Sequence, residues 1–168
     1  MSGLIRNFLT LIRALLDRGT FNTRSQTVSH FWVTPFDCGT RLLKSDKYLQ
    51  FAESAQLDFL VKTKLLGKLV RDGIGFVNIA QLLKFAKPIQ MFANVRAETA
   101  ISYADERNVY FSHYLYVEGK RCGEILVKMK FKKGSITVRP AEIVGECLLV
   151  KPRHIDLWDQ TLEATRKD

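Results

Sequence analysis

The sequence predicts an α+β domain in which a curved antiparallel sheet encloses one long helix. The segment Ser45–Leu66 contains neither Gly nor Pro, and its apolar residues surround most of the helix circumference, as in a helix enclosed by other elements. After Gly73 the apolar residues recur with a period near two for about sixty residues, which antiparallel strands require. A sheet that follows such a helix must curl around it to bury it.

Length and composition fit a single domain and limit the classes of partner. The 168 residues are 46% apolar and 26% charged, as in one globular domain of about 100–200 residues. The net charge of +9 favours anionic partners such as nucleic acid, acidic lipid or a phosphorylated cofactor. Because Cys38, Cys122 and Cys147 form no CxxC pair, we expect neither a disulfide framework nor a zinc knuckle, and a reducing, cytoplasmic location.

The N-terminal part, residues 1–26, is predicted to be an amphipathic helix followed by a polar linker. Apolar residues between Gly3 and Arg18 follow helical spacing, and Arg13 interrupts what would be the core of a signal peptide. No apolar run approaches the ~20 residues that span a bilayer. The helix therefore either packs on its own domain or lies on an anionic membrane, peripheral to its inner face.

The other elements are predicted from turn and capping signals. The first strand lies within Thr27–Phe36, which is rich in β-branched and aromatic residues, and is stopped by Pro35. Ser45 or Asp46 is expected to cap the helix. Turn signals separate four further strands, Gly75–Phe85, Phe92–Tyr103, Asn108–Val117 and Gly123–Phe131, and Ser135–Val138 can add a short sixth. Residues 27–140 thus form the sheet domain, and residues 141–168 form an extension with a helix over Ile155–Arg166.

Two stretches resemble a known family. Val33–Gly39 reads VTPFDCG, and Tyr48–Ala55 reads YLQFAESA. They are similar to the opening signature of hotdog acyl-CoA thioesterases of the 4-hydroxybenzoyl-CoA thioesterase type, in which Asp-x-Asp follows the first strand and a helix Tyr precedes a Glu by five residues. The resemblance covers about Val28 to Pro140. It implies a hotdog fold, homodimers that pair edge strands, and pockets between subunits for acyl-CoA or an acyl carrier.

The resemblance also implies thioester hydrolysis at the start of the helix. This reaction needs a base or nucleophile for attack on the acyl carbon and hydrogen-bond donors for the oxygen that becomes negative. The unpaired amides and the positive dipole end of a helix N-terminus supply such donors. The expected oxyanion site is formed by Ser45, Asp46, Lys47 and Tyr48. Coenzyme A enters as part of the substrate, and no separate cofactor is expected.

The catalytic base is poorly marked, because this sequence departs from the family pattern. Asp37 matches the first acid of Asp-x-Asp, but Gly39 occupies the second position, and Leu42–Asp46 contains no equivalent of the family His or Asn. The predicted catalytic carboxylates are Asp37 and Glu53, with Asp46 as an alternative. The simpler interpretation of Asp37 is a turn or cap role, that of Asp46 a contact with the helix dipole, and that of Glu53 exposure or pairing. A protein that binds acyl groups without hydrolysing them is the alternative function.

Histidine, serine and cysteine form no catalytic cluster in the sequence. The three His residues have no carboxylate or cysteine at metal-ligand spacing, so no metal site is predicted. His113 is expected to be a hydrogen-bonded core residue. The Ser residues lack a nucleophile-elbow motif.

Positive charge gathers on the last predicted strands. Lys128, Lys130 and Lys132 face outward, and such a run is usually a solvated face. In a hotdog protein these side chains could receive the phosphates of coenzyme A. Nucleic acid is the weaker interpretation because it needs exposed aromatics interleaved with the charge. The shared strand face of Tyr110, Tyr114 and Tyr116 is more simply explained by packing against a partner subunit.

Overall fold

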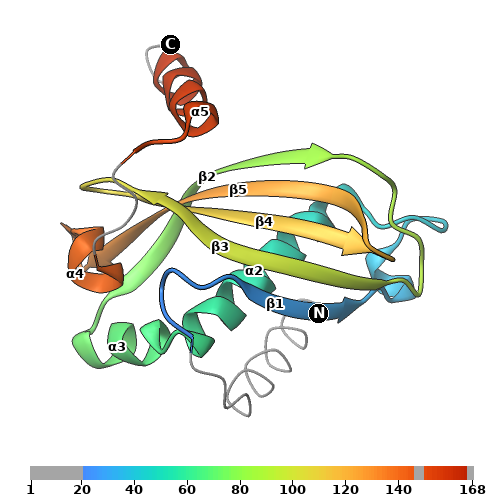
Figure 1. Ribbon diagram of the computed structural model, residues 1–168, viewed down its shortest axis with the longest axis horizontal. Coiled ribbons are helices and arrows are strands. Elements are labelled where there is room, and N and C mark those ends of the chain that lie inside the picture. The colour runs from blue at the N-terminus through green and yellow to red at the C-terminus, as the bar shows by residue number, and fades with distance from the viewer. Residues whose placement is uncertain (1–20, 146–149, 166–168) are drawn as a thin grey trace.

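The computed structural model describes residues 21–145 and 150–165 and confirms the α+β architecture. Six strands form one antiparallel sheet that curls around the long helix α2, Ser45–Lys62 (Figure 1). The strand order is β1-β3-β4-β5-β2, and β6 pairs with β5. The helix predicted between Gly3 and Arg18 lies outside the described residues. Within the described ranges, no helix is long and apolar enough to cross a membrane.

The strands of the sheet follow the predicted ranges closely. β2 spans Gly75–Phe85 as predicted, whereas the ends of four others move by one to three residues. They are β3 (Asn94–Ala104), β4 (Val109–Val117), β5 (Lys120–Lys133) and β6 (Ile136–Val138). β4 and β5 meet in a two-residue turn in which Glu118 and Gly119 both have positive φ, 49° and 76°. Positive φ at both central residues is what a tight two-residue hairpin requires.

The first strand is shorter than predicted. β1 spans Thr27–Trp32, and the short 3₁₀ helix η1, Pro35–Asp37, begins at the proline that was expected to stop the strand. The Asp37 Oδ2 atom accepts hydrogen bonds from the Thr34 amide at 3.1 Å and the Thr34 hydroxyl at 2.7 Å. This local capping arrangement, together with the fixed φ of Pro35, turns the chain away from the sheet.

The predicted helix Ser45–Leu66 is in fact two helices. α2 ends at Lys62, Lys64 adopts a left-handed conformation with φ 61°, and α3 spans Leu65–Asp72. The break redirects the chain so that Leu65 and Leu69 are buried against the core. The start of α2 is as predicted, but its cap is not: Lys44 occupies the N-cap position and makes no side-chain capping bond.

α2 is enclosed by the inner face of the sheet. Phe51 stacks on Phe31 of β1 at 5.4 Å, and the Phe59 ring meets the edge of Phe111 of β4 at 5.4 Å. A buried polar contact also joins α2 to β1, since the Ser29 hydroxyl donates to Asp58 Oδ2 at 2.6 Å. Fully buried Phe and Ala residues thus hold the helix against the strands, as the sequence predicted.

The outer face of the sheet is partly covered by the C-terminal helix. α5 spans Arg153–Ala164, two residues earlier than predicted, and follows the short helix α4, Pro140–Val144, which the sequence did not predict. Ile155 and Trp158 of α5 pack on Tyr110 and Leu126 of the sheet. Asp159 accepts hydrogen bonds from the Tyr110 hydroxyl and Lys128 Nζ, both at 2.7 Å.

Candidate functional site

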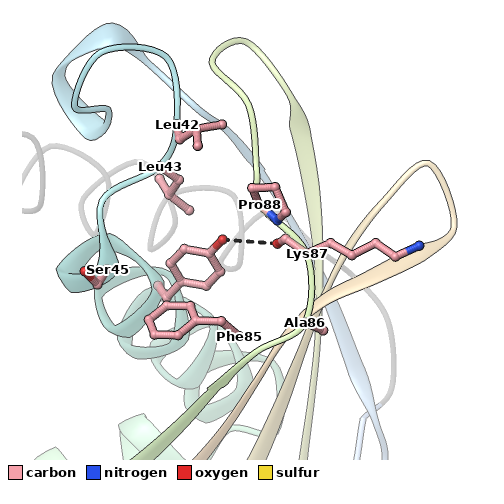
Figure 2. Close-up of a pocket in the computed structure, with 8 residues that line it drawn as sticks. Leu42, Leu43, Ser45, Phe85, Ala86, Lys87 and Pro88 are labelled. Carbon is pink, nitrogen blue, oxygen red and sulfur yellow. Dashed lines mark hydrogen bonds between the residues drawn. The ribbon is translucent and has the colours of Figure 1, made fainter.

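A pocket opens at the N-terminal end of α2, where the helix meets the segment that follows β2 (Figure 2). Its volume of about 320 Å³ lies at the lower end of the range for small-molecule sites. Most of the lining is apolar. It consists of Leu42, Leu43, Ser45, Tyr48, Phe85, Ala86, Lys87 and Pro88. The Lys87 side chain points away from the cavity, so the interior suits an apolar group (Figure 2).

Tyr48 forms the floor of this pocket. Its ring meets Phe85 edge-on at 5.0 Å, and its hydroxyl donates to the Lys87 carbonyl at 3.4 Å. Burial raises the pKa of Tyr48, so the hydroxyl remains protonated at neutral pH. The ring lies against Gly123 of β5, where an added Cβ would be only 3.0 Å from Tyr48 Cδ1. The absence of a side chain at Gly123 therefore lets the ring pack flat on the sheet.

The start of α2 supplies hydrogen-bond donors at the pocket wall. The Lys47 amide bonds the Lys44 carbonyl at 3.0 Å, while the amides of Ser45 and Asp46 donate to no atom of the described residues. They stand at the positive end of an eighteen-residue helix. Ser45 lines the pocket, whereas the Lys47 side chain bonds Gln50 at 3.0 Å. Of the four predicted oxyanion residues, Ser45 and Tyr48 thus line the pocket, whereas Asp46 and Lys47 do not.

The predicted carboxylates do not line this pocket. Asp37 is 1% exposed, and its Oδ2 atom holds the Thr34 cap described above. Its backbone oxygen accepts from the Lys44 amide at 3.0 Å, so the residue adjoins the start of α2 while its side chain serves the turn. A Cβ added at Gly39 would meet no atom within 4 Å, so this position has room for a side chain.

Asp46 and Glu53 both lie on the outward side of α2. The Asp46 side chain is 61% exposed and lies 3.9 Å from Lys47 Nζ. Glu53 is exposed, and within the described ranges it makes no hydrogen bond or ion pair. It follows Ser45 by eight residues, which is about 12 Å along the helix axis. Glu53 of one chain therefore does not reach a group bound at the first turn of its own helix.

The predicted phosphate-binding lysines lie away from the pocket. Lys128 pairs with Asp159 and is only 15% exposed, so its charge is already neutralised under α5. Lys132 lies opposite Gly75, whereas the pocket residue Phe85 lies opposite Gly123. The nine residue steps from Gly123 to Lys132 correspond to roughly 30 Å along β5.

The remaining candidates are located in the core. His113 is fully buried, and its Nδ1 atom lies 2.9 Å from the Thr99 hydroxyl, as predicted for a hydrogen-bonded core histidine. Burial lowers the pKa of His113 to about 3. Cys38 is also buried, and burial raises the pKa of its thiol. In the described part of the chain, no three His, Cys, Asp or Glu side chains gather as metal ligands.

Sequence reasoning missed most of the pocket lining. Leu42 lies before α2, whereas Phe85 and Pro88 belong to one run at the end of β2, and only the fold brings these two segments together. The sequence signals at these positions were a strand end and a Lys87-Pro88 turn, neither of which points to a ligand. Gly123 was predicted only as the start of a strand.

Comparison with sequence families gives one match. The thioesterase-like superfamily matches residues 41–144, which include α2 and most of the sheet. No curated protein matches the sequence.

Solved structures show the same fold. A gentisyl-coenzyme A thioesterase is 18% identical with a TM-score of 0.63, covering 70% of this chain and 98% of its own. A 4-hydroxybenzoyl-CoA thioesterase variant in complex with 4-hydroxybenzoyl-CoA is 13% identical with a TM-score of 0.64, covering 71% and 96%. DHNA-CoA thioesterase from Staphylococcus aureus is 12% identical with a TM-score of 0.62, covering 84% and 94%. At these identities the likeness shows the hotdog fold alone.

Proposed function

Since the chain belongs to the thioesterase-like superfamily, we propose that it hydrolyses acyl-CoA thioesters at the N-terminal end of α2. The observation that supports this most is the meeting of an apolar pocket with unpaired helix amides. Ser45 belongs to both, because its amide is free within the described residues and it lines the cavity. Similar folds carry thioesterases for gentisyl-CoA and DHNA-CoA. The acyl group occupies the pocket, and coenzyme A extends outward from it.

The oxyanion is the part of the reaction that the helix can stabilise. With the acyl chain against Tyr48 and Phe85, the thioester carbonyl oxygen faces the amides of Ser45 and Asp46. Attack of water on the acyl carbon places negative charge on that oxygen, where the amides and the helix dipole stabilise it. Collapse of the tetrahedral intermediate breaks the C–S bond and releases the coenzyme A thiol and the free acid.

The water needs a carboxylate base, which we assign to Glu53 or Asp37. Glu53 is accessible, but it reaches a thioester at the first turn only in a neighbouring copy of the chain. Asp37 is close to the start of α2 in the same chain, but it must first release its bonds from Thr34. A base at the scissile bond contributes about 10²–10⁴-fold to the rate.

The edge strand β2 makes a homodimer part of this proposal. β2 pairs with β5 on one side, and its eleven residues leave the other edge unpaired within the described chain. Five large apolar side chains of this strand are exposed: Phe76, Val77, Ile79, Leu82 and Phe85. A long apolar edge of this kind is a template for pairing with another strand. Because Phe85 also lines the pocket, pairing here builds the pocket wall from two copies.

Antiparallel pairing of β2 with β2 also brings the basic strand ends to the pocket. The start of one β2 strand then lies beside the end of the other, so Lys132 of the partner subunit, opposite Gly75, approaches the pocket lined by Phe85. Lys130 and Lys132 are the lysines that we propose for the coenzyme A phosphates. Lys128 is left out because it pairs with Asp159.

Thiol release from a panel of acyl-CoAs tests the proposal. Wild-type protein should release free thiol, and either Glu53→Gln or Asp37→Asn should lower kcat about a hundredfold or more with little change in KM. Asp72→Asn, on α3, is the matched control for loss of a carboxylate. Full activity in both test variants would refute the assigned bases, and no thiol release from any acyl-CoA would refute hydrolysis.

A non-catalytic acyl-binding protein is the second candidate function. The supporting observation is that no carboxylate lines the pocket in the described part of one chain. Gly39, at the position of the second acid of the family signature, is also consistent with a loss of hydrolysis. Saturable binding of fatty acyl-CoA without turnover, lost in Tyr48→Ala, would support this function over hydrolysis.

A further inference from the structure

The three most exposed aromatic side chains in the described ranges are gathered at one end of the molecule. Phe36 is 81% exposed, Phe92 67% and Trp32 61%, and Leu42 beside them is 47% exposed. They belong to the end of β1 and to two loops, residues 33–44 and 86–93, which lie together at the end toward which β1 points (Figure 1). We call these four residues the tip residues.

Backbone hydrogen bonds hold the tip residues on a fixed platform. The Val33 amide bonds the Ala93 carbonyl at 3.0 Å, and the Phe92 amide bonds the Val33 carbonyl at 2.9 Å. The Met91 amide bonds the Arg41 carbonyl at 2.9 Å, which joins the two loops a second time. The aromatic rings are therefore attached to a backbone that hydrogen bonds hold in place.

Phe92 in particular combines an exposed ring with an unusual backbone conformation. Its φ of 65° is in the left-handed region, which bulky residues rarely adopt. Asn or Gly would fit this conformation without strain. A phenyl ring kept exposed in a strained conformation is a common mark of a functional surface.

The charges around the tip residues are positive. Arg41, Lys44 and Lys87 of the two loops are exposed, whereas the loops' one carboxylate, Asp37, is buried in its cap. The whole chain carries +9. Exposed Trp and Phe side chains beside Lys and Arg are typical of a surface that inserts into the headgroup region of an anionic bilayer.

We propose that this end of the protein docks on an anionic lipid bilayer through Trp32, Phe36, Leu42 and Phe92. Leu42 is both a tip residue and part of the pocket lining, and Lys87 adjoins the mouth. Docking thus places the mouth of the pocket at the membrane surface, where long-chain acyl groups partition. β1 and β2 are opposite edges of the sheet, so β2 pairing leaves Trp32 exposed. Docking does not depend on whether the pocket hydrolyses its ligand.

Sedimentation of the full chain with vesicles tests this docking. Wild-type protein should bind phosphatidylcholine vesicles that contain phosphatidylglycerol more tightly than pure phosphatidylcholine vesicles, and salt should weaken the binding. Combining Phe36→Ser with Phe92→Asn should weaken binding about tenfold for each ring removed. The control combines Val70→Ser with Leu157→Ser, which removes exposed apolar side chains of α3 and α5 (73% and 52% exposed) and should bind as wild type.

Tryptophan fluorescence gives a second readout that needs no variant. The chain contains two tryptophans, of which Trp158 of α5 is packed on the sheet and 7% exposed, whereas Trp32 is 61% exposed. Docking should therefore blue-shift the emission of Trp32, and brominated lipids should quench it. Absence of quenching, no preference for anionic vesicles, or equal binding by the tip and control variants would overturn the proposal. A changed oligomeric state of the Phe36→Ser, Phe92→Asn variant would also overturn it, because the tip residues would then belong to an interface between copies of the chain. Thiol release from soluble acyl-CoA should stay unchanged in the tip variant, which separates this proposal from that of hydrolysis.

Discussion

Gly123→Ala tests whether the Tyr48 ring is held flat against β5. The added Cβ would be 3.0 Å from Tyr48 Cδ1 and 3.2 Å from Cε1, closer than an ordinary van der Waals contact, so the ring must move. Overpacking of this kind costs about 1–3 kcal/mol. Replacing Gly by Ala in an extended strand recovers about 0.4–1 kcal/mol through the unfolded state. We expect a net loss of about 1–2 kcal/mol in the free energy of unfolding.

The matched background is Tyr48→Ala, in which the ring is absent. There the next-nearest atom to the added Cβ is Leu115 Cδ1 at 3.7 Å, an ordinary contact, so Gly123→Ala should be neutral or slightly stabilising. Urea unfolding of the four proteins at one protein concentration gives the coupling energy, which we expect to be about 1.5–3 kcal/mol. Equal effects of Gly123→Ala in both backgrounds would show that the ring does not lie on Gly123.

Three further predictions concern the sheet and α5. Burial alone would raise the pKa of Asp159, but hydrogen bonds from Lys128, Lys151 and Tyr110 lower it below 3.8. The ionised Asp159 therefore stabilises the folded state fully at pH values above its unfolded pKa of 3.8. This stabilisation is lost as the pH falls through the pKa of the folded state. Asp159→Asn should cost about 3 kcal/mol and speed amide hydrogen exchange in α5; unchanged exchange would contradict this. Burial lowers the pKa of His113 to about 3 from 6.5, so the folded state loses about 1.4 kcal/mol of stability per pH unit below 6.5. His113→Gln should remove this dependence of stability on pH from acid unfolding curves. Leu82→Lys on the exposed β2 edge should turn a dimer into a monomer in light scattering; a wild-type monomer, or a dimeric variant, would refute β2 pairing.

Much of the fold could be predicted because its signals are local. β2 begins and ends where Gly73 and the Lys87-Pro88 turn place it, and the enclosed helix follows from apolar residues on nearly all sides. The end of α2 could not be predicted, because Thr63 and Lys64 are both compatible with a helix. Lys64 takes the left-handed conformation without the Gly that usually marks it. Phe92 also takes a left-handed conformation without being a Gly, and β3 therefore begins at Asn94, two residues later than predicted.

The candidate site was predicted only at its helical part. Ser45 and Tyr48 follow from the start of the helix, but the pocket forms where Tyr48, Phe85 and Gly123 meet across three elements. Contacts between residues so far apart in sequence have no local pattern. The ion pair between Lys128 and Asp159 is likewise a contact between residues far apart in sequence. It excludes Lys128 from the phosphate-binding lysines that the sequence predicted.

Amide chemical shifts test the central claim most directly, which is that the acyl thioester lies between the start of α2 and the pocket floor. Labelled protein would be titrated with a non-hydrolysable acyl-CoA thioether ketone, whose carbonyl stands in for that of the substrate. The largest changes should fall on the amides of Ser45 and Asp46 and on residues beside Tyr48 and Phe85, and Tyr48→Ala should abolish them. Saturable binding that leaves these amides unmoved would contradict the proposed site.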